Sequence, residues 1–521
     1  MSKFFDKLGK KAANLGQIGH SNEGQSNHAR GEWQDAPFDA HPNKHQIYTY
    51  RKQRGVNLGS LFTLETWLTP SLFEGVQGAR SEFDLCSALD GNTVRQRLEK
   101  HWNTFVNQGD WQWMKSNGIN TVRLPLSYYH FLPGHPDTNV RGLMADTEYE
   151  RFSPIYQNAH QCILNIIQAA GSHGIGVLID LHGAPGGQNG EGHCGLSTGK
   201  ANFFEKSKNR KNTISILLAI AATITQYENV IGLELINEPQ NHQKLPQWYA
   251  DAVHELCEKY GTRLPLYLGD CWSVEQYSQL LAQNRHLGFL VMDHHLYRCF
   301  TSNDHSKSAK QHAEEIHPSN NGPSLGLLSN ASDKLQGDFV IGEWSAALHH
   351  TSLQGLPSHQ DGQREWAFAQ LEAYHQNCGG FYFWTLKKEG PPDAGWCLYS
   401  AVEQGVLPSG LGAPHASKPV DQLASFGETE ATKAHEGHVN YWNAHADGKP
   451  MNHEKFKAGF QQLWADCLAF YQSDASQIGF SGRWTEQRAK AYSKQFGSEG
   501  EWEYVHGARQ ACQAFNHAIH T

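Results

Sequence analysis

The sequence of 521 residues lacks any apolar run approaching the roughly 18 residues of a transmembrane helix, so we expect no membrane-spanning segment. Net charge is also small, at -9 with a pI near 6.4, which excludes the basic footprint of a nucleic-acid-binding protein. The first residues, from Met1 onward, include lysines but no apolar core of about 7–15 residues, so no secretory signal is recognisable. We therefore expect a cytoplasmic protein; removal of a signal from the sequence would instead indicate secretion.

The residue motifs that typically bind metal ions or nucleotides are not recognisable either. None of the ten cysteines forms a Cys-x-x-Cys pair, and the 31 histidines include no His-Glu-x-x-His motif. A Gly-x-Gly-x-x-Gly pattern occurs at residues 190–195, but it does not directly follow an apolar run, as a dinucleotide-binding fingerprint would. We expect reduced, mostly buried thiols and neither a metal ion nor another cofactor.

Aromatic residues and glycine, in contrast, are plentiful. The chain has 50 glycines, 15 tryptophans, 19 tyrosines and 24 phenylalanines, a composition that argues against disorder. In a protein with a mean hydropathy of -0.59, so many tryptophans are a weak indication of carbohydrate binding.

Eight short apolar or β-branched runs, separated by helical stretches, indicate parallel βα units. The runs are 54–60, 121–126, 176–182, 230–238, 265–270, 289–297, 338–344 and 380–386. Helices are expected between them at 92–117, 153–172, 212–227, 247–259 and 362–376. This pattern predicts an α/β fold, a (β/α)8 TIM barrel, and favours it over a doubly wound open sheet.

We divide the chain into an irregular lead-in (1–45), the catalytic barrel (46–407) and a C-terminal extension (408–521) packed on the barrel. In the extension we expect a long Gly- and His-rich loop over 408–450, followed by helices at 456–471, 484–496 and 503–520. Apolar residues at near-helical spacing from Phe4 to Leu15 indicate either a docked terminal helix or a segment that contacts a membrane surface.

Chemically active side chains gather at the C-terminal ends of six runs, the face on which a (β/α)8 barrel carries its active site. They are Arg123, Asp180 with His182, Asn237 with Glu238, Asp293 with His294, His295 and Tyr297, Glu343 with Trp344, and Trp384 with Lys387. A single strand-end glutamate is more often structural, but a glycosidase needs one protonated and one ionised carboxyl. The pair Glu238 and Glu343 is therefore our catalytic candidate.

Six ordered segments resemble glycoside hydrolase family 5, in particular its fungal exo-β-1,3-glucanase branch. They are Ile236-Asn237-Glu238-Pro239, residues 54–59 with 69–74, and residues 180–190, 292–297, 342–348 and 383–387. Two departures concern the substrate: Gly59-Ser60-Leu61 stands where the family has Gly-Gly-Trp, and Leu296 stands where it has a third histidine.

The resemblance implies a retaining enzyme that releases glucose from the non-reducing end of β-1,3-glucan or short β-glucosides by double displacement. It implies that Glu343 is the nucleophile, kept ionised by Arg123, and that Glu238 is the general acid and then the base. It further implies substrate binding by Glu65, Arg123, His182, Asn237, His295, Tyr297 and Trp384.

Other interpretations stay open. An intracellular β-glucosidase acting on a steryl glucoside or glucosylceramide would need a long apolar groove beside the glucose site, and a transglycosylase would use the same chemistry. A non-catalytic carbohydrate-binding barrel would not need both glutamates. A metal-dependent hydrolase would use Asp180 with His182, and Asp293 with His294 and His295, as ligands. The sequence does not indicate an oligomeric state.

Overall fold

The computed structural model describes residues 38, 40–261, 263–413, 418–446 and 450–520. All eight predicted strands are present, at β1 Gln53–Asn57, β2 Thr121–Ser127, β3 Gly176–Gly183, β4 Val230–Glu234, β5 Leu266–Gly269, β6 Leu290–Arg298, β7 Phe339–Leu348 and β8 Gly380–Phe383. Neighbouring strands are parallel and follow chain order, and β8 pairs with β1. The predicted (β/α)8 barrel is confirmed. The segment near residues 4–15, for which a docked terminal helix or a membrane contact was considered, lies outside the described residues.

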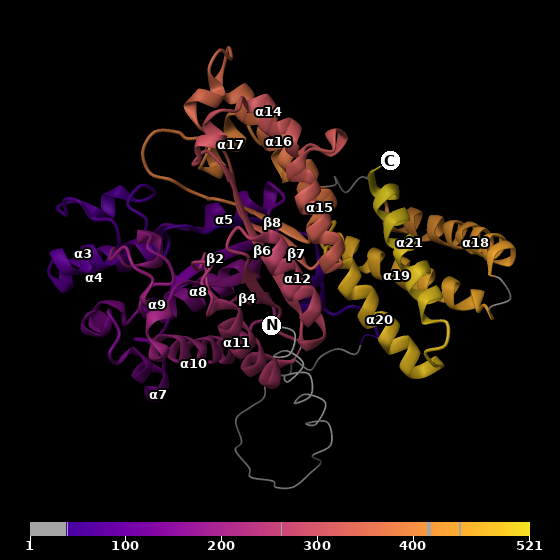
Figure 1. The fold of residues 1–521 in the computed structure, drawn as a ribbon, viewed down its shortest axis with the longest axis horizontal. Coiled ribbons are helices and arrows are strands. Elements are labelled where there is room, and N and C mark those ends of the chain that lie inside the picture. The colour runs from indigo at the N-terminus through magenta and orange to yellow at the C-terminus, as the bar shows by residue number, and fades with distance from the viewer. Residues whose placement is uncertain (1–37, 39, 262, 414–417, 447–449, 521) are drawn as a thin grey trace, which may run out of the picture. The chain divides into compact units, whose positions relative to one another are not determined.

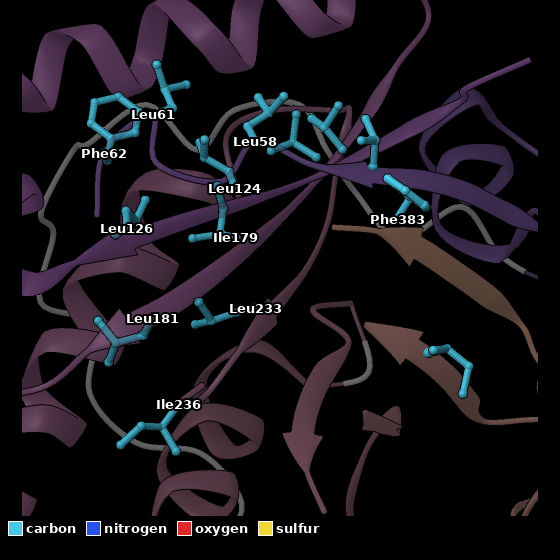
Figure 2. Close-up of a cluster of buried hydrophobic side chains, with 14 of the residues drawn as sticks. Leu58, Leu61, Phe62, Leu124, Leu126, Ile179, Leu181, Leu233, Ile236 and Phe383 are labelled. Carbon is cyan, nitrogen blue, oxygen red and sulfur yellow. The ribbon is translucent and has the colours of Figure 1, made fainter. Parts of the chain in front are cut away.

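Apolar residues on both faces of the strands hold the barrel together. Seven of the eight strands are buried along their whole length, and only the end of β6 reaches partial exposure. Such strands read as continuous apolar runs, as parallel strands covered by helices should. Figure 2 shows part of this core, in which Leu124, Ile179 and Leu233 come from three successive strands.

The surrounding helices follow the predicted intervals (Figure 1). They are α2 Lys44–Tyr50, α3 Glu82–Ala88, α4 Gly91–Thr104, α5 Gln108–Ser116, α6 Tyr128–Phe131, α7 Thr138–Arg141, α8 Ala159–Ser172, α9 Asn202–Glu205, α10 Ser207–Ile224, α11 Leu245–Tyr260, α12 Val274–Asn284, α13 Ser302–His305, α14 Ala309–Ile316, α15 Pro323–Leu335, α16 His359–Asn377 and α17 Leu398–Glu403. The single helix expected over 92–117 is wrong, because the Asn107 side chain caps a new helix by accepting from the Gly109 N–H.

Four further helices, α18 Val420–His445, α19 His453–Gln472, α20 Ser481–Phe496 and α21 Glu501–His520, form the C-terminal domain. The last three match the predictions, but the long loop expected over 408–450 is wrong for most of its length, because α18 occupies it. Gly427 suggested a loop by composition, yet a Cβ there would lie 2.2 Å from Nε1 of Trp464. The glycine therefore serves close packing between α18 and α19.

This C-terminal domain covers the N-terminal end of the barrel. Phe480 and Tyr50 both contact the ring of Phe289, which immediately precedes β6, at centroid distances of 5.3 and 5.1 Å. Asp338, just before β7, accepts from Arg483 at 2.7 Å. The C-terminal ends of the strands, where the candidate site residues lie, are on the other face.

Among the described residues, we find no helix with the length and apolar character required to cross a bilayer.

Candidate active site

Arg123 is the third residue of β2 and not at its C-terminal end as expected, yet its side chain makes the central set of polar contacts in the site. Its guanidinium is fully buried and contacts five side chains: Glu234 at 2.7 Å, Asn237 at 2.8 Å, Glu343 at 2.9 Å, Asn57 at 3.0 Å and Asp180 at 3.1 Å. Burial raises the pKa of Glu234 well above its usual range.

The two predicted catalytic carboxyls come together, as the sequence analysis expected. One oxygen of Glu238 and one of Glu343 lie within 4.8 Å of each other. The imidazole of His295 contacts both, with Nδ1 2.6 Å from Oε1 of Glu238 and 3.5 Å from Oε2 of Glu343. This spacing agrees with the separation of about 5–5.5 Å in retaining glycosidases and is shorter than the about 6.5–9.5 Å of inverting ones.

The pair is held so that it carries one proton. Burial raises the pKa of Glu343 to about 7, against the opposing charges of His295 and Arg123. Burial also disfavours ionisation of Glu238, but the hydrogen bond and charge of His295 outweigh it and lower the pKa of Glu238 to about 2. Carboxyls this close titrate as a unit, with one proton leaving near pH 2 and the second near pH 7. Between these values one carboxyl is neutral and the other is charged.

Two donors to Glu343 oppose the rise in its pKa that burial causes. The Tyr297 hydroxyl donates to its Oε2 at 2.7 Å and Arg123 donates to its Oε1 at 2.9 Å. Hydrogen bonds to the ionised form stabilise that form. The backbone before Glu343 is also held in place: the Gly342 N–H donates to Asp293 at 2.7 Å, and a Cβ on Gly342 would lie 2.2 Å from that carboxylate.

Local backbone conformation directs Glu238 into the site. Its φ is 40°, in the left-handed region that a non-glycine residue adopts at a cost of order 1–3 kcal/mol. Asn189 Nδ2 donates to its carbonyl oxygen at 2.9 Å and secures this conformation. The Glu238 side chain also has a contact from the loop after β3: His193 Nε2 lies 3.4 Å from its Oε2.

A cavity of about 1200 Å³ opens over the carboxyl pair. Seven of the nine predicted site residues line it: Glu65, His182, Glu238, His295, Tyr297, Glu343 and Trp384. Arg123 and Asn237 lie beneath it, both with an exposed fraction of 0%. All nine predicted residues are therefore gathered in one place, seven on the cavity wall and two supporting them.

The cavity wall includes a parallel stack of Trp384 on His182, with ring centroids 5.9 Å apart and planes inclined by 9°. Burial lowers the pKa of His182 well below its usual value, so the ring is neutral. Its Nδ1 then donates to Asp180 at 2.6 Å and its Nε2 accepts from Asn237 at 3.4 Å. Asp180 is thus a supporting residue.

Glu65 lies in another part of the cavity wall. Its carboxyl accepts from the indole of Trp67 at 2.8 Å, and burial raises its pKa to about 7. A neutral or hydrogen-bonded carboxyl is suited to contact sugar hydroxyls.

Sequence reasoning missed several residues of the site. Glu234 was visible as a charge inside the apolar β4 run, a signal that a buried cation would be needed. His193 comes from the loop after β3, where its sequence neighbours give no chemical signal. Trp67, Trp272 and Trp396 join the cavity wall from three loops.

The carboxyl pair and His295 are also close enough to hold a metal ion. However, the Arg123 guanidinium already lies 2.9 Å from Glu343 and supplies the positive charge there. A second cation beside it would be repelled.

Two known protein families match most of the chain. The model of cellulase (glycosyl hydrolase family 5) matches residues 86–390, and that of the glucan 1,3-beta-glucosidase 3 C-terminal domain matches residues 424–519. The second match coincides with the domain formed by α18–α21.

Individual relatives agree with these matches. The chain is 34% identical to glucan 1,3-beta-glucosidase 3 of Schizosaccharomyces pombe, over 90% of this chain and 96% of the relative. It is 30% identical to an uncharacterized glycosyl hydrolase of Saccharomyces cerevisiae, over 90% of this chain and 92% of the relative. The crystal structure of rutinosidase from Aspergillus niger has the same fold, with a TM-score of 0.54, 19% identity and coverage of 69% and 98%.

Proposed function

This chain belongs to glycosyl hydrolase family 5, and we propose that it removes glucose from the non-reducing end of β-1,3-glucan chains with retention of configuration. The observation that carries the proposal is the Glu238–Glu343 pair, whose oxygens lie within 4.8 Å in a cavity on the catalytic face. The named S. pombe relative supports the choice of substrate.

In the first step, the Glu343 carboxylate attacks the anomeric carbon and forms a glucosyl-enzyme ester. Glu238 gives its proton to the departing glycosidic oxygen, so the bond breaks without releasing an alkoxide. Arg123 and Tyr297 lower the free energy of the ionised nucleophile through the contacts described above.

In the second step, Glu238 takes a proton from water, and the water oxygen attacks the anomeric carbon from the side opposite Glu343. The ester breaks and Glu343 leaves as a carboxylate, so two inversions give net retention. Asn237, buried beneath the cavity and bonded to Arg123 and His182, supports the side chains that face the sugar. A sugar in place of water would make the same step a transglycosylation.

The outer cavity favours a glucan over a lipid as the group attached to glucose. Exposed aromatic rings line it, with Trp272 58% and Phe300 67% exposed, and such rings suit stacking on sugar faces. The same wall contains the ion pair of Lys307 and Glu315, at 2.7 Å. A fatty or sterol tail would have to desolvate these charges, which is costly.

The substrate test compares kcat/KM for laminari-oligosaccharides, a steryl glucoside and glucosylceramide, with Glu343→Gln as the inactive control. We expect the laminari-oligosaccharides to be preferred and the β-anomer of glucose to appear first by NMR. Preferential cleavage of either glycolipid would replace the proposed substrate, and initial release of the α-anomer would overturn the retaining mechanism.

We also propose that the protein works in the cytoplasm. All ten cysteines are free and seven of them are buried, a state typical of reducing compartments. Fractionation of cells that produce the tagged full chain tests this, since recovery in the culture medium would contradict it.

A further inference from the structure

Three helices of the C-terminal domain bring two histidines and a glutamate together. His438 lies on α18, His453 begins α19, and Glu503 lies in the first turn of α21. His438 Nε2 is 3.0 Å and His453 Nδ1 is 3.4 Å from Oε2 of Glu503. One ligand atom from each residue lies within 4.8 Å of the other two.

These separations suit a tetrahedral metal ion. Bonds of about 2.0–2.2 Å from imidazole nitrogen and carboxylate oxygen to zinc place neighbouring ligand atoms about 3.3–3.5 Å apart. Only small side-chain shifts would then admit the ion. The Nδ1 atom of His453 has no hydrogen-bond partner in the described part of the chain, so no hydrogen bond would have to break for it to bind an ion.

The surroundings are also those of a metal site. The side chains of His438 and Glu503 are each 1% exposed, and the ring of Phe456 stacks on His438 at 4.1 Å. The Asn452 N–H donates to the other oxygen of Glu503 at 2.6 Å and orients the carboxylate, as outer partners of metal ligands do.

We propose that the C-terminal domain binds one Zn²⁺ ion through His438, His453 and Glu503. Two imidazole nitrogens with one carboxylate favour zinc over calcium or magnesium, which prefer all-oxygen sites. His453 has a side chain exposed by 20%, so water can enter and complete the tetrahedron. The ion joins α18, α19 and α21, and its role is structural because this domain covers the end of the barrel remote from Glu238 and Glu343.

The test uses the purified full chain after dialysis against EDTA. We expect about one Zn²⁺ per chain by elemental analysis after zinc is restored, and a higher thermal unfolding temperature with zinc than without it. His453→Asn, at a partly exposed position, should fold but bind zinc at least about tenfold more weakly. Hydrolysis of an aryl β-glucoside below the unfolding temperature should not change with zinc.

The matched control is His445→Asn, an exposed histidine on α18, the helix of His438; its ring hydrogen-bonds only the Tyr441 carbonyl among the described contacts. It should keep full zinc affinity and the zinc-dependent rise in unfolding temperature. Identical zinc content and unfolding temperatures for wild type and His453→Asn would overturn the proposal and leave the cluster a hydrogen-bonded trio. Glucosidase activity is a separate measurement, so its loss would bear on the proposed function and not on this site.

Discussion

His295 Nδ1 lies 2.6 Å from Oε1 of Glu238, in a site where both side chains are largely buried. Charged groups surround this hydrogen bond, and the pKa of His295 is raised well above its usual value by neighbouring acidic groups that outweigh its burial. A protonated His295 allows the nearby carboxyls to share one proton instead of two. The relationship therefore sets the pH range in which an acid and a nucleophile coexist.

The first prediction concerns this pH range. We expect kcat/KM for an aryl β-glucoside to fall above about pH 7, where the pair loses its last proton and no carboxyl remains to act as acid. Tyr297→Phe removes a hydrogen bond that lowers the pKa of Glu343. The pair should then keep its proton to higher pH, and the alkaline limb should move upward by up to about one unit, with roughly tenfold lower kcat.

Full pH–rate profiles of wild type and variant provide the measurement. Tyr441→Phe, at an exposed tyrosine of α18, is the control and should leave the profile unchanged. An alkaline limb that moves downward in Tyr297→Phe would contradict the assignment.

The second prediction identifies the nucleophile. Glu343→Ala should lower turnover of an aryl β-glucoside by at least about 10³-fold, because the covalent step is lost. Azide should restore activity by occupying the vacated space and give the α-glucosyl azide. Glu238→Ala should give the β-azide instead, since azide then attacks the glucosyl-enzyme. NMR of the products distinguishes the two, and exchanged outcomes would reverse the roles.

The third prediction concerns the contact between the barrel and the C-terminal domain. Phe480 is fully buried, 5.3 Å from the ring of Phe289, and a Cβ on Gly379 would touch its ring. Phe480→Ala should lower the free energy of unfolding by about 3–5 kcal/mol in urea titrations. The kcat/KM of the folded protein should stay within about twofold, because the active site is on the other face.

Phe496→Ala is the matched control, since Phe496 is 57% exposed at the end of α20. Phe496→Ala should change the free energy of unfolding by no more than about 0.5 kcal/mol. Equal destabilisation by both substitutions would show that the barrel does not depend on this contact.

The local pattern of apolar residues predicted the barrel well. Strands that are buried on both faces need continuous apolar runs, and the helices between them show apolar residues at helical spacing. The pattern failed at α18, where Gly427 and several histidines lower helix propensity. Packing against Trp464 outweighs that propensity. It also missed His193, since a loop residue reaches Glu238 only through the path of the chain in space.

The sequence by itself determined the order of the strands and the presence of a glutamate after β4 and another on β7. Parallel strands in a barrel bring their C-terminal ends to one face, so both glutamates necessarily lie on the same side of the barrel. Only the tertiary structure decided that Arg123 and Tyr297 both donate to Glu343 and that His295 contacts both carboxyls. Those contacts join residues from different strands, and distances of a few ångströms between them depend on register and burial that no local pattern records.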